Sequence, residues 1–211
     1  MDIVEKVLKN RILPIVRGVT GEKIDKYVSS LKAADIDIIE VSLSTLDALE
    51  TINYLKKTYP DMTVGAGTVL NIEDAVKAME AGAQFIVTPG YIPELVDFLK
   101  MKDVPVIPGV ATPTDITRAV CQKVYLLKIF PASQLTTEFF KAVQGPFPMI
   151  KMMAVGGITV DNASEFIKAG ACSIGMGNGL FKGEDGADIS EHDFKVRING
   201  LKNIFNEVKK E

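Results

Sequence analysis

Residues 150–176, IKMMAVGGITVDNASEFIKAGACSIGM, combine two apolar runs with a helical run between them. Residues 150–155 and 172–176 are short and mostly apolar, as in strands that are buried on both faces. Residues 160–169 carry apolar side chains at helical spacing, and Gly170 follows where a helix usually ends. A strand, a helix and a second strand joined this closely indicate a parallel βαβ unit.

The same unit recurs along the chain. The helix-to-strand phrase Lys168-Ala169-Gly170-Ala171 has a close counterpart in Glu80-Ala81-Gly82-Ala83. Strand-like runs follow one another at a spacing of about 20 to 25 residues. They cover residues 12–17, 37–43, 62–66, 84–88, 104–108, 124–129, 150–155 and 172–176. Helix-like runs cover residues 23–34, 46–59, 72–81, 93–101, 113–120, 137–143 and 160–169.

Eight strands, each followed by a helical pattern, predict a parallel (β/α)8 barrel, the TIM-barrel architecture, as a single domain over residues 1–211. Asn71 and Thr112 are the expected N-caps of two helices. An extra N-terminal helix at residues 3–10 should precede the barrel, and a helix at residues 194–209 should close it. An open doubly wound sheet is the alternative, and eight units in so short a chain favour the barrel.

The composition is that of a globular protein with one sizeable core, since 47% of the 211 residues are hydrophobic and 24% are charged. The net charge of -3 includes no basic block that could follow a phosphate backbone, so no nucleic-acid partner is expected. The first residues lack a secretory signal pattern, and no apolar run approaches the length of a membrane span. We therefore expect a cytoplasmic protein without a membrane partner.

The residues that most often bind metals are few in this chain. Cys121 and Cys172 lie far apart without a CxxC spacing, and we expect two buried free thiols. His192 is the only histidine and lies in a polar stretch, which disfavours a metal site and a Ser-His-Asp triad. We expect no metal and no cofactor, and chemistry that uses Lys, Glu, Asp, Tyr or backbone groups.

Lys128 lies inside the apolar run 124–130, VYLLKIF, which reads as a buried strand and breaks at Pro131. Burial penalises the charged ammonium, so such a site should lower the lysine pKa and leave a nucleophilic amine. A nucleophilic lysine is the main requirement of Schiff-base catalysis. The alternative is a lysine that extends from the strand end into water.

Two further ionisable residues are expected near Lys128, because the functional groups of a barrel gather at the C-terminal ends of its strands. Alternation along residues 38–43 points Glu40 into the barrel, and Arg17 shares one face of the first strand with Ile15. A buried carboxylate that pairs with a structural lysine is the alternative reading of Glu40. The convergence of Glu40, Lys128 and Arg17 on one mouth favours a functional site.

Several strands end in glycine-rich turns. The third ends in VGAGTV, where Thr68 supplies a hydroxyl, and the fourth ends in Thr88-Pro89-Gly90. The last two strands end in AVGGI and GMGNG, and turns at these two places commonly bind phosphate in such barrels. They indicate a phosphorylated ligand, although tight turns without a ligand stay an alternative.

The phrases IIEVSLST, VGAGTVLN, GAQFIVTPG, VIPGVATPTDI, LLKIFPAS, AVGGIT and GMGNGLF resemble, in order and spacing, the 2-keto-3-deoxy-6-phosphogluconate (KDPG) and 4-hydroxy-2-oxoglutarate (KHG) aldolases. The resemblance extends over residues 12–181. It implies a (β/α)8 barrel, a homotrimer, and a class I aldolase that needs neither metal nor cofactor. It also implies a phosphorylated 2-keto sugar acid as substrate, in sugar-acid breakdown of the Entner-Doudoroff type.

The resemblance also implies roles for single residues. Lys128 in LKIFPA corresponds to the Schiff-base lysine, and Glu40 in IEVSL corresponds to the general acid/base. The residues that correspond to substrate-binding groups are Arg17 and Thr68 for the pyruvate carboxylate, Pro89 beside them, and Gly157, Gly177 and Asn178 for the phosphate.

Three departures leave the substrate open. The phosphogluconate branch often has arginine, threonine and serine where this chain has Ser44, Val155 and Asn178. The 2-dehydro-3-deoxy-6-phosphogalactonate (KDPGal) aldolases resemble the chain in Arg17, LKIFP and AVGG. We expect cleavage of a 6-phosphogluconate-type substrate to pyruvate and glyceraldehyde 3-phosphate. The alternatives are a phosphogalactonate or 4-hydroxy-2-oxoglutarate aldolase, a phosphate-sugar isomerase or epimerase, and a non-catalytic phosphometabolite-binding barrel.

Overall fold

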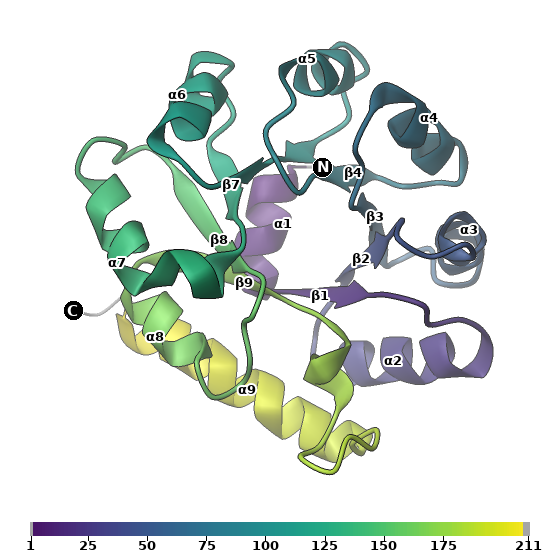
Figure 1. Cartoon of the computed structure of the whole chain (residues 1–211). Coiled ribbons are helices and arrows are strands. Elements are labelled where there is room, and N and C mark those ends of the chain that lie inside the picture. The colour runs from purple at the N-terminus through teal and green to yellow at the C-terminus, as the bar shows by residue number, and fades with distance from the viewer. Residues whose placement is uncertain (1, 209–211) are drawn as a thin grey trace.

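The protein is a barrel of parallel strands surrounded by helices, described by a computed structural model over residues 2–208. The strands are β1 Ile12–Val16, β2 Ile38–Ser42, β3 Thr63–Gly67, β4 Phe85–Val87, β5 Val106–Ile107, β6 Gly109–Val110, β7 Leu126–Ile129, β8 Lys151–Val155 and β9 Ala171–Met176. The helices are α1 Ile3–Asn10, α2 Gly21–Ala33, α3 Ala48–Thr58, α4 Ile72–Glu80, α5 Pro93–Met101, α6 Pro113–Cys121, α7 Ala132–Gln144, α8 Ala163–Lys168, the 3-10 helix η1 Asn178–Phe181 and α9 Glu191–Val208. Figure 1 looks along the barrel, with α2 to α8 outside the ring of strands.

The barrel closes through its fifth strand, which is broken into β5 and β6. The strand order is β5-β4-β3-β2-β1-β9-β8-β7-β6, and all neighbours run parallel. The first half of the fifth strand pairs with β4 and the second half pairs with β7. The (β/α)8 barrel is therefore confirmed, whereas the unbroken strand expected at residues 104–108 is wrong. Pro108 has no N–H to donate, and it separates the two halves.

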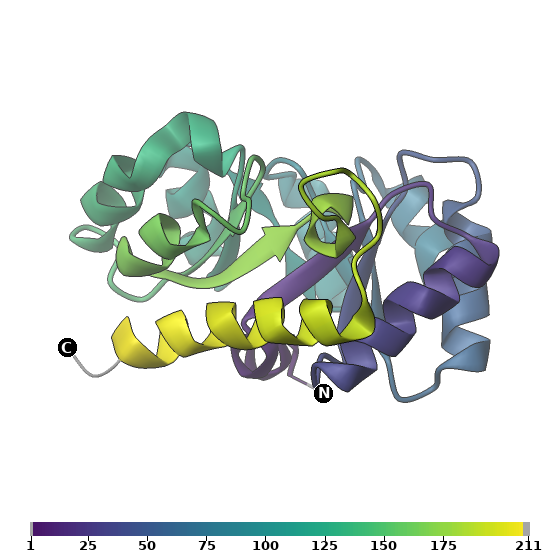
Figure 2. The ribbon, with the colours of Figure 1, turned by 90° about the horizontal axis from the view of Figure 1, so that it is seen from below.

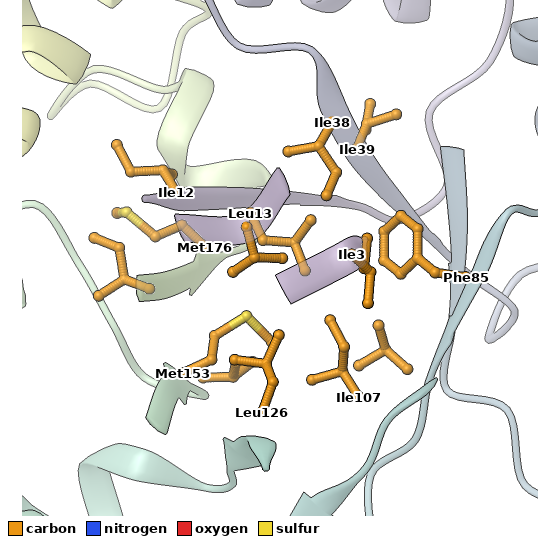
Figure 3. Packing of buried hydrophobic residues seen from close by; sticks show 14 of the residues in the cluster. Ile3, Ile12, Leu13, Ile38, Ile39, Phe85, Ile107, Leu126, Met153 and Met176 are labelled. Atoms are coloured by element: carbon orange, nitrogen blue, oxygen red, sulfur yellow. The ribbon is translucent and has the colours of Figure 1, made fainter. Parts of the chain in front are cut away.

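The interior of the barrel is filled by apolar side chains from most of the strands. Figure 3 shows Leu13, Phe85, Leu126 and Met153 among the side chains of this core, and all four are buried. Gly65 of β3 leaves room for the ring of Phe85, since a Cβ on this glycine would lie 2.2 Å from Phe85 Cζ. This packed layer lies below the open end of the barrel, so only the upper ends of the strands can contribute to a site.

The expected N-terminal helix is confirmed as α1, and it covers the lower end of the barrel. The side chain of Asn10 bonds to Asp37 just before β2, through its Nδ2 to Asp37 Oδ1 at 2.7 Å and through its Oδ1 from the Asp37 N–H at 3.0 Å. Lys6 adds an ion pair to the same carboxylate at 2.6 Å. The bottom of the barrel is thus closed, and its other end is left for function.

Most helix boundaries follow the expected signals. Asn71 and Thr112 are confirmed as N-caps that accept hydrogen bonds from the N–H groups of Asp74 and Asp115. Gly82 and Gly170 follow α4 and α8 with φ of +106° and +104°, a conformation that favours glycine.

Other boundaries differ from the prediction. Helix α7 begins five residues before the expected 137–143, and a kink at Thr136 separates its first turn from the rest. Helix α8 is shorter than 160–169, because Asn162 closes a turn onto Thr159 before the helix begins. The last helix, expected at 194–209, begins at Glu191, and Lys209 lies outside the described residues. Figure 2 shows α9 along one side of the barrel.

The expectation of two buried thiols is wrong for Cys121, which is exposed, and Cys172 is partly buried. Cys121 is the last residue of α6, whose buried side chains are Ile116 and Ala119. At about 100° per residue, Cys121 lies outside the face that these two define.

Within residues 2–208, no helix is both long and apolar enough to cross a membrane.

Candidate active site

A cavity of about 460 Å³ opens at the carboxyl ends of the strands. It is lined by every residue to which the sequence assigned a catalytic or substrate-binding role, namely Arg17, Glu40, Thr68, Pro89, Lys128, Gly157, Gly177 and Asn178. The other lining residues are Ile15, Phe130, Val155, Gly156, Ile158 and Gly175. Val155 is one of the three departures, and Gly156, Ile158 and Gly175 belong to the two glycine turns, whereas the sequence predicts no site role for Ile15 and Phe130. Several of these are apolar, so the cavity combines a few charged groups with a dry wall, as small-molecule sites usually do.

Lys128 is the third residue of β7, and its side chain is only 5% exposed. Its main-chain N–H donates to the carbonyl of Pro108 at 2.9 Å, which fixes the residue in the sheet. The Nζ lies 4.9 Å from the centre of the Phe130 ring. Burial lowers the lysine pKa, the positive Arg17 lowers it further, and the negative Glu40 opposes both effects. The result is an amine that loses its proton more readily than a lysine in water.

Glu40 occupies the middle of β2 and is 1% exposed. Strand alternation directs it into the barrel as expected, and its Oε2 has no hydrogen-bond partner within residues 2–208. Burial raises the pKa of this carboxyl, and the charges of Lys128 and Arg17 offset part of that rise. A carboxyl with a raised pKa and an unpartnered oxygen can exchange a proton with a group in the cavity.

Gly67, the last residue of β3, makes the space that Glu40 occupies. A Cβ on this glycine would lie 1.7 Å from Glu40 Oε1 and 2.4 Å from its Cδ. The carboxylate therefore depends on a glycine in the neighbouring strand, which pairs with β2 through Ser42.

We expect the Gly67→Ala variant to lose activity by about 10- to 100-fold, because misplacing a catalytic group by about 1 Å is costly. The assay is steady-state turnover, with the melting temperature as a measure of folding. Gly200→Ala is the matched control, since a Cβ on this exposed glycine of α9 meets nothing within 4 Å. Turnover of Gly67→Ala within twofold of the wild type would show that Glu40 does not depend on this space.

Thr68 presents its hydroxyl to the cavity from the turn after β3, with a φ of +60°. Its Oγ1 lies 2.8 Å from Ser42 Oγ, which in turn lies 2.9 Å from Ser44 Oγ. Ser42 is 1% exposed and was not predicted as part of the site, although it shares a strand face with Glu40. Its hydroxyl holds Thr68 in one orientation, which favours a fixed hydrogen-bond direction toward a ligand.

Arg17 lies just beyond β1, which ends at Val16, so the strand predicted for residues 12–17 is one residue too long. Its exposed side chain lies at the rim of the cavity, where its charge lowers the pKa of both Lys128 and Glu40. A guanidinium at this rim can bind a carboxylate through two parallel hydrogen bonds.

The two glycine turns follow the neighbouring strands β8 and β9, and they line the cavity beside the end of β1. Gly156 and Gly157 after β8 have φ of +92° and +72°, and a Cβ on Gly157 would lie 2.1 Å from Ser133 Oγ. The second turn places Gly177 before η1, a single 3-10 turn. This turn is too short to act as the N-terminus of a long helix, so the donors that the two turns offer an anion are backbone N–H groups. In residues 2–208, no three His, Cys, Asp or Glu side chains are close enough to hold a metal ion.

Comparison with known proteins matches this arrangement to one family. The family model described as "KDPG and KHG aldolase" matches residues 3–194. The chain is 36% identical to a 2-dehydro-3-deoxy-phosphogluconate aldolase of Treponema pallidum, over 78% of this chain and 79% of the relative. It is 32% identical to a 2-dehydro-3-deoxy-6-phosphogalactonate aldolase of Escherichia coli, over 81% of this chain and 84% of that protein.

A solved structure of the KDPG aldolase from Legionella pneumophila, with pyruvate captured as a covalent carbinolamine intermediate, superposes with a TM-score of 0.83. It is 26% identical in sequence, and the match covers 97% of this chain and 98% of that one. The family match extends over most of the chain, and the residues quoted from its motifs meet in one cavity. The chain belongs to the KDPG and KHG aldolase family.

Proposed function

We propose that this protein is a class I aldolase that cleaves a 2-keto-3-deoxy-6-phospho sugar acid to pyruvate and glyceraldehyde 3-phosphate. The observation that carries the proposal is that a buried lysine with a lowered pKa shares one cavity with a buried glutamate whose Oε2 is unpartnered. An amine nucleophile and a proton-transfer group are the two components that Schiff-base cleavage of a carbon-carbon bond requires.

The reaction begins when the neutral amine of Lys128 attacks the C2 ketone of the substrate. The carbinolamine loses water and becomes an iminium ion, which can accept the electron pair of an adjacent bond. Burial of Lys128 supplies the neutral amine, and the Arg17 charge assists because it disfavours a second positive charge nearby.

Cleavage requires that the C4 hydroxyl lose its proton. Glu40 takes this proton, directly or through a water molecule, and the C3–C4 electron pair moves into the iminium as the aldehyde is released. The product on Lys128 is the enamine of pyruvate. Glu40 returns the proton to C3, and hydrolysis of the resulting imine frees pyruvate and restores the amine.

The remaining lining residues position the substrate. Arg17 and Thr68 hold the carboxylate so that C2 meets the Lys128 amine, and Pro89 forms the wall beside them. Gly157, Gly177 and Asn178, at the ends of β8 and β9, hold the phosphate through main-chain N–H groups. Such positioning supplies several kcal/mol of barrier reduction in enzymes generally.

The phosphogalactonate epimer is the second candidate substrate. Val155 lines the cavity with an apolar side chain where the phosphogluconate branch often has threonine, and the Escherichia coli relative that is 32% identical is named as a phosphogalactonate aldolase. The two substrates differ only in configuration at C4, close to Glu40. Turnover of both epimers and of 4-hydroxy-2-oxoglutarate, measured side by side, identifies the substrate.

Borohydride reduction in the presence of pyruvate tests the mechanism. The reduced imine should add a pyruvate-derived mass to one peptide, the one that contains Lys128, while omission of pyruvate gives no adduct. A folded protein that yields no such peptide is not a class I aldolase. The isomerase and binding-module alternatives predict that negative result, because neither forms an imine.

We also propose a homotrimer that works in the cytoplasm. Leu70 and Ile72 are exposed apolar side chains that line the same surface hollow, and exposed apolar patches often mark contacts between subunits. Sedimentation should give a particle of three times the chain mass. The cytoplasmic location follows from the substrate, since a sugar acid that carries both a carboxylate and a phosphate crosses membranes poorly.

A further inference from the structure

The side chain of Asn178, just after β9, is bonded to the main chain of Arg17, just after the neighbouring strand β1. Its Oδ1 accepts a hydrogen bond from the Arg17 N–H at 3.1 Å, and its Nδ2 donates to the Arg17 carbonyl at 2.8 Å. Both main-chain groups of one residue are therefore held by a single amide. Only an orientation with Oδ1 toward the N–H and Nδ2 toward the carbonyl satisfies both bonds.

This contact lies just beyond the last main-chain pair between β1 and β9. Strands β1 and β9 pair from Ile12 with Ile174 to Pro14 with Met176, and the chain then leaves the sheet at Gly177 to form η1. The amide of Asn178 substitutes for the strand that is no longer present beside Arg17. Gly18, with a φ of +60°, then turns the chain away from the barrel.

The segment that carries Asn178 is itself firmly held. The ring of Phe181 stacks between Tyr27 and Phe194, with ring centres 3.7 Å and 4.9 Å away. Arg197 donates to the carbonyl of Leu180 at 2.9 Å. The amide therefore projects from a packed turn onto a residue whose own side chain is exposed, so Asn178 can fix Arg17 more than Arg17 can fix Asn178.

The amide has little capacity left to bind an anion, since the two bonds to Arg17 leave one N–H of Nδ2 as its only free donor. A serine hydroxyl at this position is shorter and cannot span the N–H and the carbonyl of one residue in the same way. The departure at residue 178 thus changes what the side chain is bonded to, and the phosphate side retains its backbone donors.

We propose that Asn178 is a positioning residue for Arg17, and that it fixes the carboxylate-binding end of the cavity while standing at the phosphate-binding end. The inference rests on the proposed aldolase function, and it deepens the role of Asn178 in that site. Pyruvate carries the carboxylate and the ketone but no phosphate. It therefore separates the two ends, because a side chain that serves the phosphate alone should leave pyruvate binding unchanged.

The test is a titration of imine formation with pyruvate, followed by borohydride reduction and intact-protein mass spectrometry. We expect the half-saturating pyruvate concentration to rise about tenfold in Asn178→Ala, the scale of losing one or two hydrogen bonds that order a charged group. The maximal extent of trapping at saturating pyruvate should stay near that of the wild type. Asn203→Ala, the same change at an exposed position of α9, should leave the titration unchanged.

A double-variant cycle shows whether the effect passes through Arg17. In an Arg17→Ala background, Asn178→Ala should change the half-saturating concentration by less than twofold, because the guanidinium that it positions is gone. Melting temperatures establish that each variant is folded, and Asn178→Ser takes the place of Asn178→Ala in the same cycle where the alanine variant is unstable.

Three results would overturn the proposal. One is a half-saturating concentration for Asn178→Ala within twofold of the wild type, and another is an equal effect of Asn178→Ala with and without Arg17. Either leaves the aldolase function intact, since the wild type still forms its adduct. The third, a folded wild type without any pyruvate adduct, overturns the aldolase proposal and this inference together.

Discussion

Lys128→Met should give no borohydride-stable adduct with pyruvate, and aldolase turnover should fall by at least about 10⁴-fold, as for the loss of a covalent nucleophile. Methionine has nearly the length of lysine, and it suits a side chain that is 5% exposed beside the Phe130 ring. The fold should therefore persist while the amine disappears. Intact-protein mass spectrometry after reduction and steady-state turnover are the two measurements.

The control is Lys151→Met, which makes the same change at an exposed lysine at the start of the neighbouring strand β8. Its adduct and its turnover should match those of the wild type. Lys128→Arg adds a second comparison, because a guanidinium keeps a positive charge but forms no imine under these conditions. A pyruvate adduct on Lys128→Met, mapped to another lysine, would contradict the assignment of the nucleophile.

The pH dependence of imine formation follows from the same environment. Since burial and Arg17 lower the Lys128 pKa, the amine is neutral at pH values where a lysine in water is protonated. The rate should rise with pH and level off below 10.5, the ordinary lysine value, and it should fall as pH drops through the lowered pKa. Arg17→Ala removes one cause of the lowering, so its profile should shift to higher pH. An unshifted profile would mean that the Arg17 charge does not act on Lys128.

The parts of the site that the sequence predicts are those fixed by local rules. Alternation within a strand determines the direction of Glu40 and Lys128, and it depends only on adjacent residues. Parallel pairing then brings the strand ends to one mouth, so side chains far apart in sequence converge without further information. Parallel pairing also brings the glycine turns after β8 and β9 to that mouth.

The remaining features depend on contacts that sequence spacing does not encode. Asn178 and Arg17 are 161 positions apart, and their bonds arise because β9 ends opposite Pro14 whereas β1 continues to Val16. Ser42 belongs to a predicted face, but its bond to Thr68 requires the positive φ of that residue. The break at Pro108 divides the fifth strand into two halves. The first half, β5, pairs with β4, and the second half, β6, pairs with β7. Such details are set by barrel closure, which no single segment determines.

Glu40→Gln should separate the two stages of the reaction. Glutamine fits the space that Gly67 leaves but cannot take a proton, so cleavage should fall by about 10²- to 10⁴-fold, the usual contribution of a general acid/base. The imine with pyruvate should still form. Glu80→Gln, at an exposed position at the end of α4, is the matched control. A parallel loss of imine and cleavage would instead assign Glu40 to support of the Lys128 amine.

The charge of Glu40 gives a second way to distinguish a role in cleavage from a role in support of the Lys128 amine. Glu40 raises the Lys128 pKa, against the effects of burial and of Arg17. Its replacement by a neutral amide removes that opposing effect, so the pKa of Lys128 should fall further. Imine formation in Glu40→Gln should therefore persist to lower pH than in the wild type, even though cleavage is lost. A profile that shifts to higher pH would mean that Glu40 helps to remove the proton from the Lys128 ammonium. Proton transfer at the C4 hydroxyl would then belong to another group.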